Sequence, residues 1–163
     1  MAGFEPAATL PYLPDVARIE RAWTEACHSP EEVPLELAAF GAIEADELPQ
    51  IRLLLHPSLR IVRSRLPALA VWHMNVGDGV PAPVDLAAGG EDALVIRPAA
   101  EVEVRSMPPG GAEFVDALAE RKSVTEATRA ATRADGRFDL AANLAGLIGA
   151  GAFVGYSFTG ETR

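Results

Sequence analysis

The sequence has a single cysteine, no long apolar run and no segment that resembles a secretory signal. Cys27 has no second cysteine with which to form a disulfide, and one thiol excludes a thiolate-rich metal site. No apolar stretch approaches the roughly 20 residues that a membrane-spanning helix needs, and no basic segment precedes an apolar one. We therefore predict a cytoplasmic protein that has no contact with a membrane.

Basic residues are also scarce. The chain has 14 lysines and arginines against 23 acidic residues, a net charge of −9. Proteins that bind nucleic acid usually present a positive surface that releases counterions from the phosphates, so this balance argues against nucleic acid as a partner. The stretch from Arg52 to Arg65 is an exception, since it holds four arginines and no acid. Its arginines either lie on the solvent face of a strand or contact an acidic partner.

Histidines number three, His28, His56 and His73. None of them stands at a two-histidine metal spacing such as that of the H-E-x-x-H motif. The sequence offers no base, nucleophile and orienting group that can be assigned to catalytic roles. We therefore predict a protein that is not an enzyme and that binds no metal or cofactor.

The chain is long and apolar enough to fold. Its 163 residues are 49% hydrophobic, so it can bury a core. This length suits one ordinary domain or two small ones that share an interface. The patterns divide it into an N-terminal helix and strand region, residues 1–90, and a C-terminal module, residues 91–163. The predicted fold class is α+β.

The N-terminal region opens with a predicted helix. Pro14 suits the first turn, and the apolar residues after it follow helical spacing as far as Cys27. The helix is expected to end near His28, before Pro30. A loop is predicted over residues 31–41, because prolines argue against a long regular element there.

Two strands are predicted next, over residues 51–55 and 59–64. The turn His56-Pro57-Ser58 separates them. The segment 67–75 is apolar and contains Trp72, and its periodicity fits either a buried strand or a short helix. Both interpretations stay open on the sequence alone.

The C-terminal module has the predicted order strand, strand, three helices and strand. Val102 and Val104 alternate with charged residues over 101–107, the period of a strand with one buried face, and another strand is predicted over 93–97. A Pro-Pro-Gly-Gly break follows. The three helices and the returning strand are expected at 112–120, from Ser123, from Asp139 and at 152–158. This is the order of a winged-helix-like module.

Two of these helices have specific sequence signals. Ser123 and Glu126 form a capping box, in which each side chain accepts a hydrogen bond from the other residue's backbone. The third helix has one apolar stripe at helical spacing, formed by Leu140, Leu144, Leu147 and Ile148.

Several motifs together resemble the C-terminal region of the HvfC/BufC family, whose members were long described as DNA-binding domains. They are PYLPDVARIE at 11–20, LHPSLR at 55–60, Arg63-Ser64, Trp72, Val102-Glu103-Val104 and the helices after Pro109. The resemblance thus spans nearly the whole chain. The family's further N-terminal helical domain has no counterpart in these 163 residues.

The resemblance implies a non-catalytic partner protein of a multinuclear non-haem iron oxidative enzyme. Such pairs modify ribosomally made precursor peptides that contain cysteine. In related systems the partner holds the leader segment of the precursor and presents the rest to the iron site of the enzyme. The expected partners are therefore the iron enzyme and the precursor peptide.

The C-terminal module is also similar to the peptide-recognition elements of peptide-maturation enzymes. In those, a leader peptide adds as a strand to the edge of a small sheet and packs against the third helix. The expected peptide-binding residues are Val102, Val104 and Arg105 on the strand, with Leu140, Leu144 and Ile148 on the helix. The same leucines could instead fill the domain core.

A winged-helix transcriptional regulator is the alternative function. A DNA-reading helix needs polar or basic side chains that reach base edges and phosphates. The third helix offers only Asn143 for this, beside Asp139, which would repel the phosphate backbone. Helix composition and net charge therefore make DNA binding the weaker hypothesis.

The surface that would meet the iron enzyme is the least determined by the sequence. Protein interfaces concentrate their binding energy in buried aromatic and arginine anchors. The candidates are Trp23, Arg60, Arg63 and Trp72. Trp23 could equally belong to the core.

Overall fold

The computed structural model describes residues 10–76, 82–158 and 161–162. Helices and strands are mixed along the chain, so the fold is α+β. The elements in order are α1 (Leu13–Cys27), α2 (Leu37–Gly41), β1 (Arg52–Leu55), β2 (Arg60–Ser64), α3 (Ala68–Val76), β3 (Glu91–Ile96), β4 (Glu103–Ser106), α4 (Gly111–Ala119), α5 (Val124–Ala134), α6 (Leu140–Gly149), β5 (Phe153–Phe158) and β6 (Glu161–Thr162).

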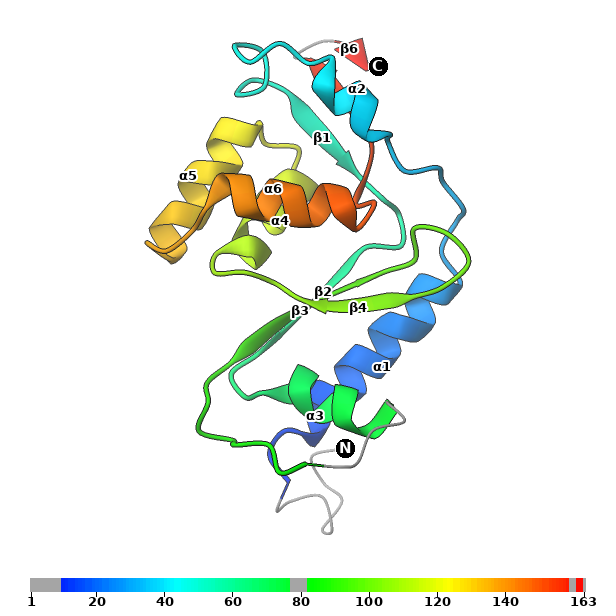
Figure 1. The fold of residues 1–163 in the computed structure, drawn as a ribbon, viewed down its shortest axis with the longest axis vertical. Helices are drawn as coiled ribbons and strands as arrows, with labels where there is room; N and C mark the ends of the chain where they lie inside the picture. The colour runs from blue at the N-terminus through cyan, green and yellow to red at the C-terminus, as the bar shows by residue number, and fades with distance from the viewer. Residues whose placement is uncertain (1–9, 77–81, 159–160, 163) are drawn as a thin grey trace.

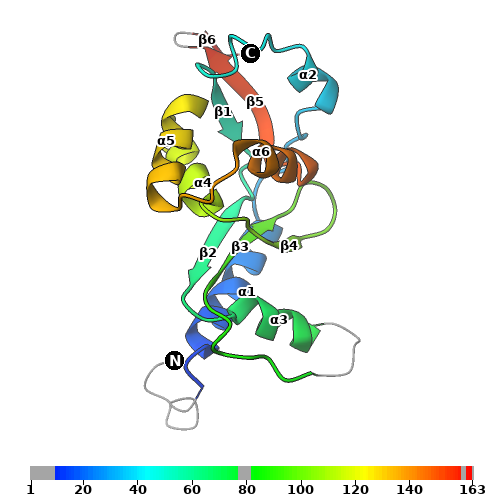
Figure 2. The same ribbon diagram turned by 60° about the vertical axis from the view of Figure 1, so that its left-hand side comes forward.

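The strands form two antiparallel sheets. The central sheet has the order β2-β3-β4, and the upper sheet has the order β1-β5-β6. Helices α4, α5 and α6 lie on one side of the central sheet, and α1 and α3 lie on the other (Figures 1 and 2). Each sheet combines strands from both sides of residue 90, so the two predicted regions share both sheets.

Both faces of β3, the middle strand of the central sheet, are buried, in two separate cores. Along β3, Ala93 and Val95 face a lower core that includes Ile19 of α1. Leu94 and Ile96 face an upper core that includes Phe114 of α4 and continues to the upper sheet. This follows from the period of two along a strand, which sends successive side chains to opposite faces. A strand buried on both faces needs a continuous apolar run, and the sequence ALVI at 93–96 supplies it.

A corner of three residues, His56-Pro57-Ser58, leads the chain from the upper sheet into the central sheet. His56 is 2% exposed and Ser58 is 0% exposed. The His56 backbone N–H donates to the Ala152 carbonyl at 2.8 Å, which ties the corner to the start of β5. The Arg97 backbone N–H donates to Ser58 Oγ at 2.9 Å, which ties it to the end of β3.

The His56 ring completes this corner. Its Nε2 lies 3.1 Å from the Glu32 carbonyl, which can only accept, so Nε2 carries the proton. Nδ1 is then the acceptor, and it receives the Ser58 backbone N–H at 3.2 Å and faces Ser58 Oγ at 2.8 Å. Both ring nitrogens are therefore satisfied without solvent, as a buried imidazole requires.

The chain packs so closely beside this corner that position 151 must be a glycine. Gly151 precedes β5 with φ of +67°, a backbone conformation that side chains rarely adopt. A Cβ there would also lie 2.8 Å from the Pro98 side chain and 3.1 Å from that of Pro34. Three segments that are distant in sequence thus meet at this point.

The structure confirms most of the predicted elements. Helix α1 ends at Cys27, and the two strands predicted on either side of the corner are present as β1 and β2. The order strand, strand, three helices and strand is present after residue 90. The capping box is also present: Ser123 N donates to Glu126 Oε2 at 2.8 Å, and Glu126 N donates to Ser123 Oγ at 3.3 Å.

The structure corrects one predicted element, decides one that had two interpretations, and shows where the returning strand pairs. The loop predicted over 31–41 is wrong at its end, because α2 occupies Leu37–Gly41, where no proline interrupts the chain. The segment 67–75, left open between strand and helix, is helical as α3. The returning strand β5 pairs with β1 and β6, and not with β3 or β4.

We predict that Ser58→Ala destabilises the protein by about 1–3 kcal/mol, because it leaves the His56 Nδ1 acceptor and the Arg97 N–H buried with one partner fewer. Urea unfolding measures the effect. Ser106→Ala is the control, since Ser106 is exposed, and it should change stability by no more than about 0.5 kcal/mol. Equal urea midpoints for Ser58→Ala and the wild type would contradict this role of the corner.

Candidate functional site

The central sheet has a free edge at β4. Among the described residues this strand pairs only with β3, with Leu94 opposite Arg105 and Val95 opposite Val104. Just after the strand, Met107 N donates to Asp92 O at 2.9 Å. Hydrogen-bonded pairs alternate along an antiparallel ladder, so Arg105 also bonds to β3 through its backbone. The N–H and C=O groups of Val104 therefore point away from β3, toward the open edge, and those of Ser106 do the same.

The outer edges of the other strands are partly covered. At β2, the Arg18 side chain donates to the Arg63 carbonyl at 3.0 Å. At the entry to β1, the backbone N–H of Val124 donates to Ile51 O at 3.0 Å, which places the start of α5 against that edge. No such bond covers Val104 among the described residues, so β4 is the strand best placed to pair with another chain.

The two faces of β4 differ in chemistry. Val102 and Val104 are half-buried and pack against the lower core. Arg105 lies opposite Leu94 and so faces the upper side, toward α6. Its Nε donates to Glu103 Oε2 at 2.8 Å, and this ion pair is partly exposed. The predicted strand residues thus lie together along one accessible edge.

A small hollow of about 90 Å³ lies between the end of β4 and α6. In Figure 1, α6 crosses above β4. The hollow is lined mainly by Leu94, Arg105, Met107, Asn143, Gly146 and Leu147. It therefore opens beside the free strand edge.

The helix residues at this hollow are not the predicted ones. Leu140, Leu144 and Ile148 are half-buried against the upper core, and Leu140 lines a different hollow beside α5. One residue along an α-helix turns its side chain by about 100°, so the face with Asn143 and Leu147 lies next to the face of the three predicted peptide-binding residues. The structure brings Val104 and Arg105 beside this neighbouring face. None of the three predicted residues lines the hollow beside β4.

The sequence contains signals for two residues that line this hollow and were not predicted, Gly146 and Asn143. Gly146 stands in the interior of an apolar helix, where glycine usually has a packing or functional reason. Asn143 interrupts the same helix with a polar side chain, which belongs in the interior only when its polar groups are used. A prediction that selects leucines by spacing passes over both.

Asn143 cannot read DNA in this fold. It is 1% exposed, and its Nδ2 donates to the Asp139 carbonyl at 2.8 Å. Its Oδ1 has no hydrogen-bond partner within the described part of the chain, and a Cβ on Gly111 would lie 2.6 Å from that oxygen. The carboxamide oxygen thus faces the α-carbon of Gly111 inside the protein, so α6 offers no polar reader to a DNA groove.

The arginines expected at an enzyme interface are paired within the chain. Arg60 donates to the Pro57 carbonyl at 2.8 Å and to Glu25 at 3.3 Å. Arg63 forms an ion pair with Glu113 and has Asp92 at 3.6 Å and Asp116 at 4.0 Å. Both side chains therefore contribute to the fold already.

The two tryptophans have different settings. Trp23 on α1 is 41% exposed. Trp72 is half-buried, packs against the lower core and lines an apolar groove of about 600 Å³ between α1 and α3. The Trp72 indole N–H is buried and has no hydrogen-bond partner among residues 10–76 and 82–158. The interface role of Trp23, Arg60, Arg63 and Trp72 stays a prediction.

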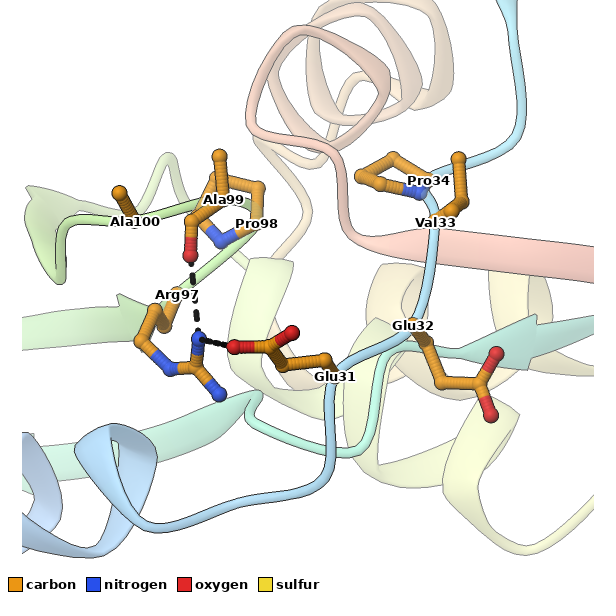
Figure 3. A pocket seen from close by; sticks show the side chains of 8 residues that line it. All are labelled: Glu31, Glu32, Val33, Pro34, Arg97, Pro98, Ala99 and Ala100. Atoms are coloured by element: carbon orange, nitrogen blue, oxygen red, sulfur yellow. Dashed lines mark hydrogen bonds and ion pairs between the residues drawn. The ribbon is translucent and has the colours of Figure 1, made fainter.

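A larger hollow of about 620 Å³ lies beside the corner, between residues 31–34 and 97–100. Figure 3 shows the Arg97 guanidinium there, between the Ala99 carbonyl at 3.1 Å and the Glu31 carboxylate at 3.5 Å. Arg97 also donates to the carbonyls of Ala26 and Ser29, at 3.1 and 2.7 Å. Its donors are thus used to fix the end of α1, which makes this hollow a weaker candidate than the β4 edge.

Neither metal-binding groups nor similarity to known proteins points to a further site in the described residues. In the part of the chain that the structure describes, no three His, Cys, Asp or Glu side chains form a group that could hold a metal ion. Within the same residues, no helix is long and apolar enough to cross a bilayer. No family model matches the chain, and neither a curated protein nor a solved structure matches it.

The acids around Arg63 give a prediction of pH dependence. Burial raises the pKa of Asp92 and of Asp116, more than the nearby Arg63 lowers them. An aspartate with a raised folded-state pKa destabilises the fold once it ionises, and this effect disappears below the ordinary pKa of about 3.8. Asp116→Asn should therefore raise the urea midpoint at pH 7 and lose that advantage as the pH falls toward 4.

Asp135→Asn is the contrasting variant. Hydrogen bonds from the side chain and backbone of Arg137 lower the pKa of Asp135 to about 2. Its ionised form therefore stabilises the fold above the ordinary pKa, and this contribution is lost on acidification. Asp135→Asn should lower the midpoint at pH 7. A lowered midpoint for Asp116→Asn at pH 7 would show that burial does not dominate at Asp116, and a raised one for Asp135→Asn would contradict the role of its bonds to Arg137.

Proposed function

We propose that this chain binds an extended peptide at the free edge of β4 and presents it to a separate enzyme. The peptide would add as a strand to the central sheet, beside α6. The observation that carries the proposal is the outward-pointing backbone of Val104 and Ser106, since main-chain hydrogen bonds supply the affinity in strand addition.

The arrangement around β4 supports peptide recognition of the winged-helix-like kind. Three antiparallel strands, β2, β3 and β4, precede three helices, and the third helix runs beside the free edge. This is the layout expected of a peptide-recognition element. DNA binding has less support, because Asn143 is buried and the chain is acidic.

The family resemblance supplies the rest of the proposal. The enzyme is a multinuclear non-haem iron oxidase, the peptide is the leader of a ribosomally made precursor, and the three act in the cytoplasm. This chain is the accessory subunit and not the catalyst. Ser58 and His56 are the neighbouring pair that could act as nucleophile and base. Both are buried and bonded within the corner, which supports a role without catalysis.

The enzyme contact is proposed on the side of α1 and α3. Val16, Glu20 and Trp23 share one face of α1 by helical spacing, and Val16 and Glu20 line the apolar groove that contains Trp72. Aromatic anchors of this kind dominate the energetics of protein interfaces. Trp23 and Trp72 are therefore favoured over Arg60 and Arg63, which are paired internally.

The test is a pulldown of the tagged chain from its native cytoplasm, compared with Val104→Pro and Val104→Thr. Proline removes the outward N–H of Val104 without removing a ladder bond to β3, and edge strands tolerate it. Threonine keeps the N–H and the branched shape. We expect an iron oxidase with all three proteins, and a short cysteine-containing peptide with the wild type and the threonine variant only.

Two results would overturn the proposal. If the peptide is recovered equally with Val104→Pro, it does not bind by strand addition at β4, and the chain is a structural subunit. If neither enzyme nor peptide is recovered and duplex DNA is enriched instead, the transcriptional regulator replaces it.

A further inference from the structure

We infer that the hollow between β4 and α6 is an anchor subsite that takes one aliphatic side chain of the bound peptide. The inference rests on the proposed strand addition and adds a rule for which peptides bind. The subsite would hold the side chain of the peptide residue that lies directly opposite Arg105. Gly146 keeps the subsite open.

The register follows from the hydrogen bonds of β4. An added strand would bond to Val104 and Ser106, whose backbone groups point outward. The peptide residue opposite Arg105 then stands in a non-hydrogen-bonded pair, where the two α-carbons approach to about 4.5 Å. Paired residues project to the same face, and Arg105 faces α6. The anchor side chain therefore points toward the hollow.

The size and chemistry of the hollow define the side chain. Leu94, Met107 and Leu147 give it apolar walls. Its volume of about 90 Å³ is smaller than the roughly 150 Å³ of a cavity that binds benzene. Valine, isoleucine or leucine fits this space, and an indole does not. The Glu103–Arg105 ion pair lies on the same face of β4 and would flank the entrance with charge.

Gly146 lines the hollow and is exposed, so a side chain at this position would stand at the rim of the subsite. A Cβ at Gly146 would meet no atom within 4 Å, so nothing in the fold requires glycine there. Glycine in a helix interior also lowers helix stability relative to other residues. A larger side chain at this position should therefore strengthen α6 while it occupies the subsite.

Gly149 provides a matched control on the same helix. A Cβ there also meets no atom within 4 Å, the residue is exposed, and it does not line the hollow. Gly146→Leu and Gly149→Leu thus add the same side chain to one helix, and only the first blocks the subsite.

The probe is a displayed library of random 12-residue peptides, selected on the wild-type chain and counter-selected on Val104→Pro. Binding of the enriched, fluorescently labelled peptides is then measured by polarisation. We expect the enriched peptides to share one aliphatic position. Gly146→Leu should bind them at least about tenfold more weakly, the effect of losing one buried aliphatic side chain, and Gly149→Leu within about twofold of wild type.

A double-mutant cycle identifies the contact. Alanine at the shared aliphatic position of the peptide should weaken binding to wild type by about tenfold, and should have little further effect on binding to Gly146→Leu. Thermal unfolding of both glycine variants should occur at or above the wild-type temperature. Weak binding by Gly146→Leu then reflects the blocked subsite and not a damaged fold.

Three results would overturn the inference. If peptides that depend on Val104 bind Gly146→Leu as tightly as wild type, strand addition stands and the subsite is wrong. If no enriched peptide depends on Val104, the proposed function fails as well. If sedimentation shows a dimer of the chain that Val104→Pro abolishes, the edge is occupied by a second copy and not by a peptide.

Discussion

The buried corner at His56 and Ser58 holds the two sheets in one structure. The imidazole and the hydroxyl link the corner to the segment after α1 and to the end of β3, and the His56 backbone N–H links it to the start of β5. A buried polar group without a partner is costly, so these bonds fix how the segments meet. Arg97 extends the same network to the last carbonyls of α1. The position of β4 beside α6 depends on this arrangement.

Charge in this protein is used mostly for internal contacts. Arg60, Arg63 and Arg97 sit in a sequence that could suggest a basic binding surface, yet each has acidic or carbonyl partners from distant elements. Groups at the surface that these contacts do not use include the backbone along β4 and the apolar area near Trp23 and Trp72. The proposed recognition by strand pairing and aromatic anchors would use these groups.

The sequence predicted the elements better than their assembly. Periodicity located α1 and the helices after residue 90, and Ser123 with Glu126 marked the start of α5, because these signals are local. The pairing of β5 with β1 depends on contacts across about a hundred residues, which no local pattern encodes. The same limit applies to the site. The alternation of Val102 and Val104 predicted a strand, and the structure confirms it as β4. The hollow beside that strand is lined by Asn143, Gly146 and Leu147, and not by Leu140, Leu144 or Ile148.

The open edge of β4 has a consequence for solubility. Unpaired strand edges invite copies of a protein to join into aggregates, and natural proteins counter this with short edge strands and charged side chains. Strand β4 has four residues, and Glu103 and Arg105 place charge on one of its faces. An edge that binds a peptide, as proposed, must also avoid pairing with a second copy of the same chain. In this chain, brevity and charge are the features that limit edge-to-edge aggregation.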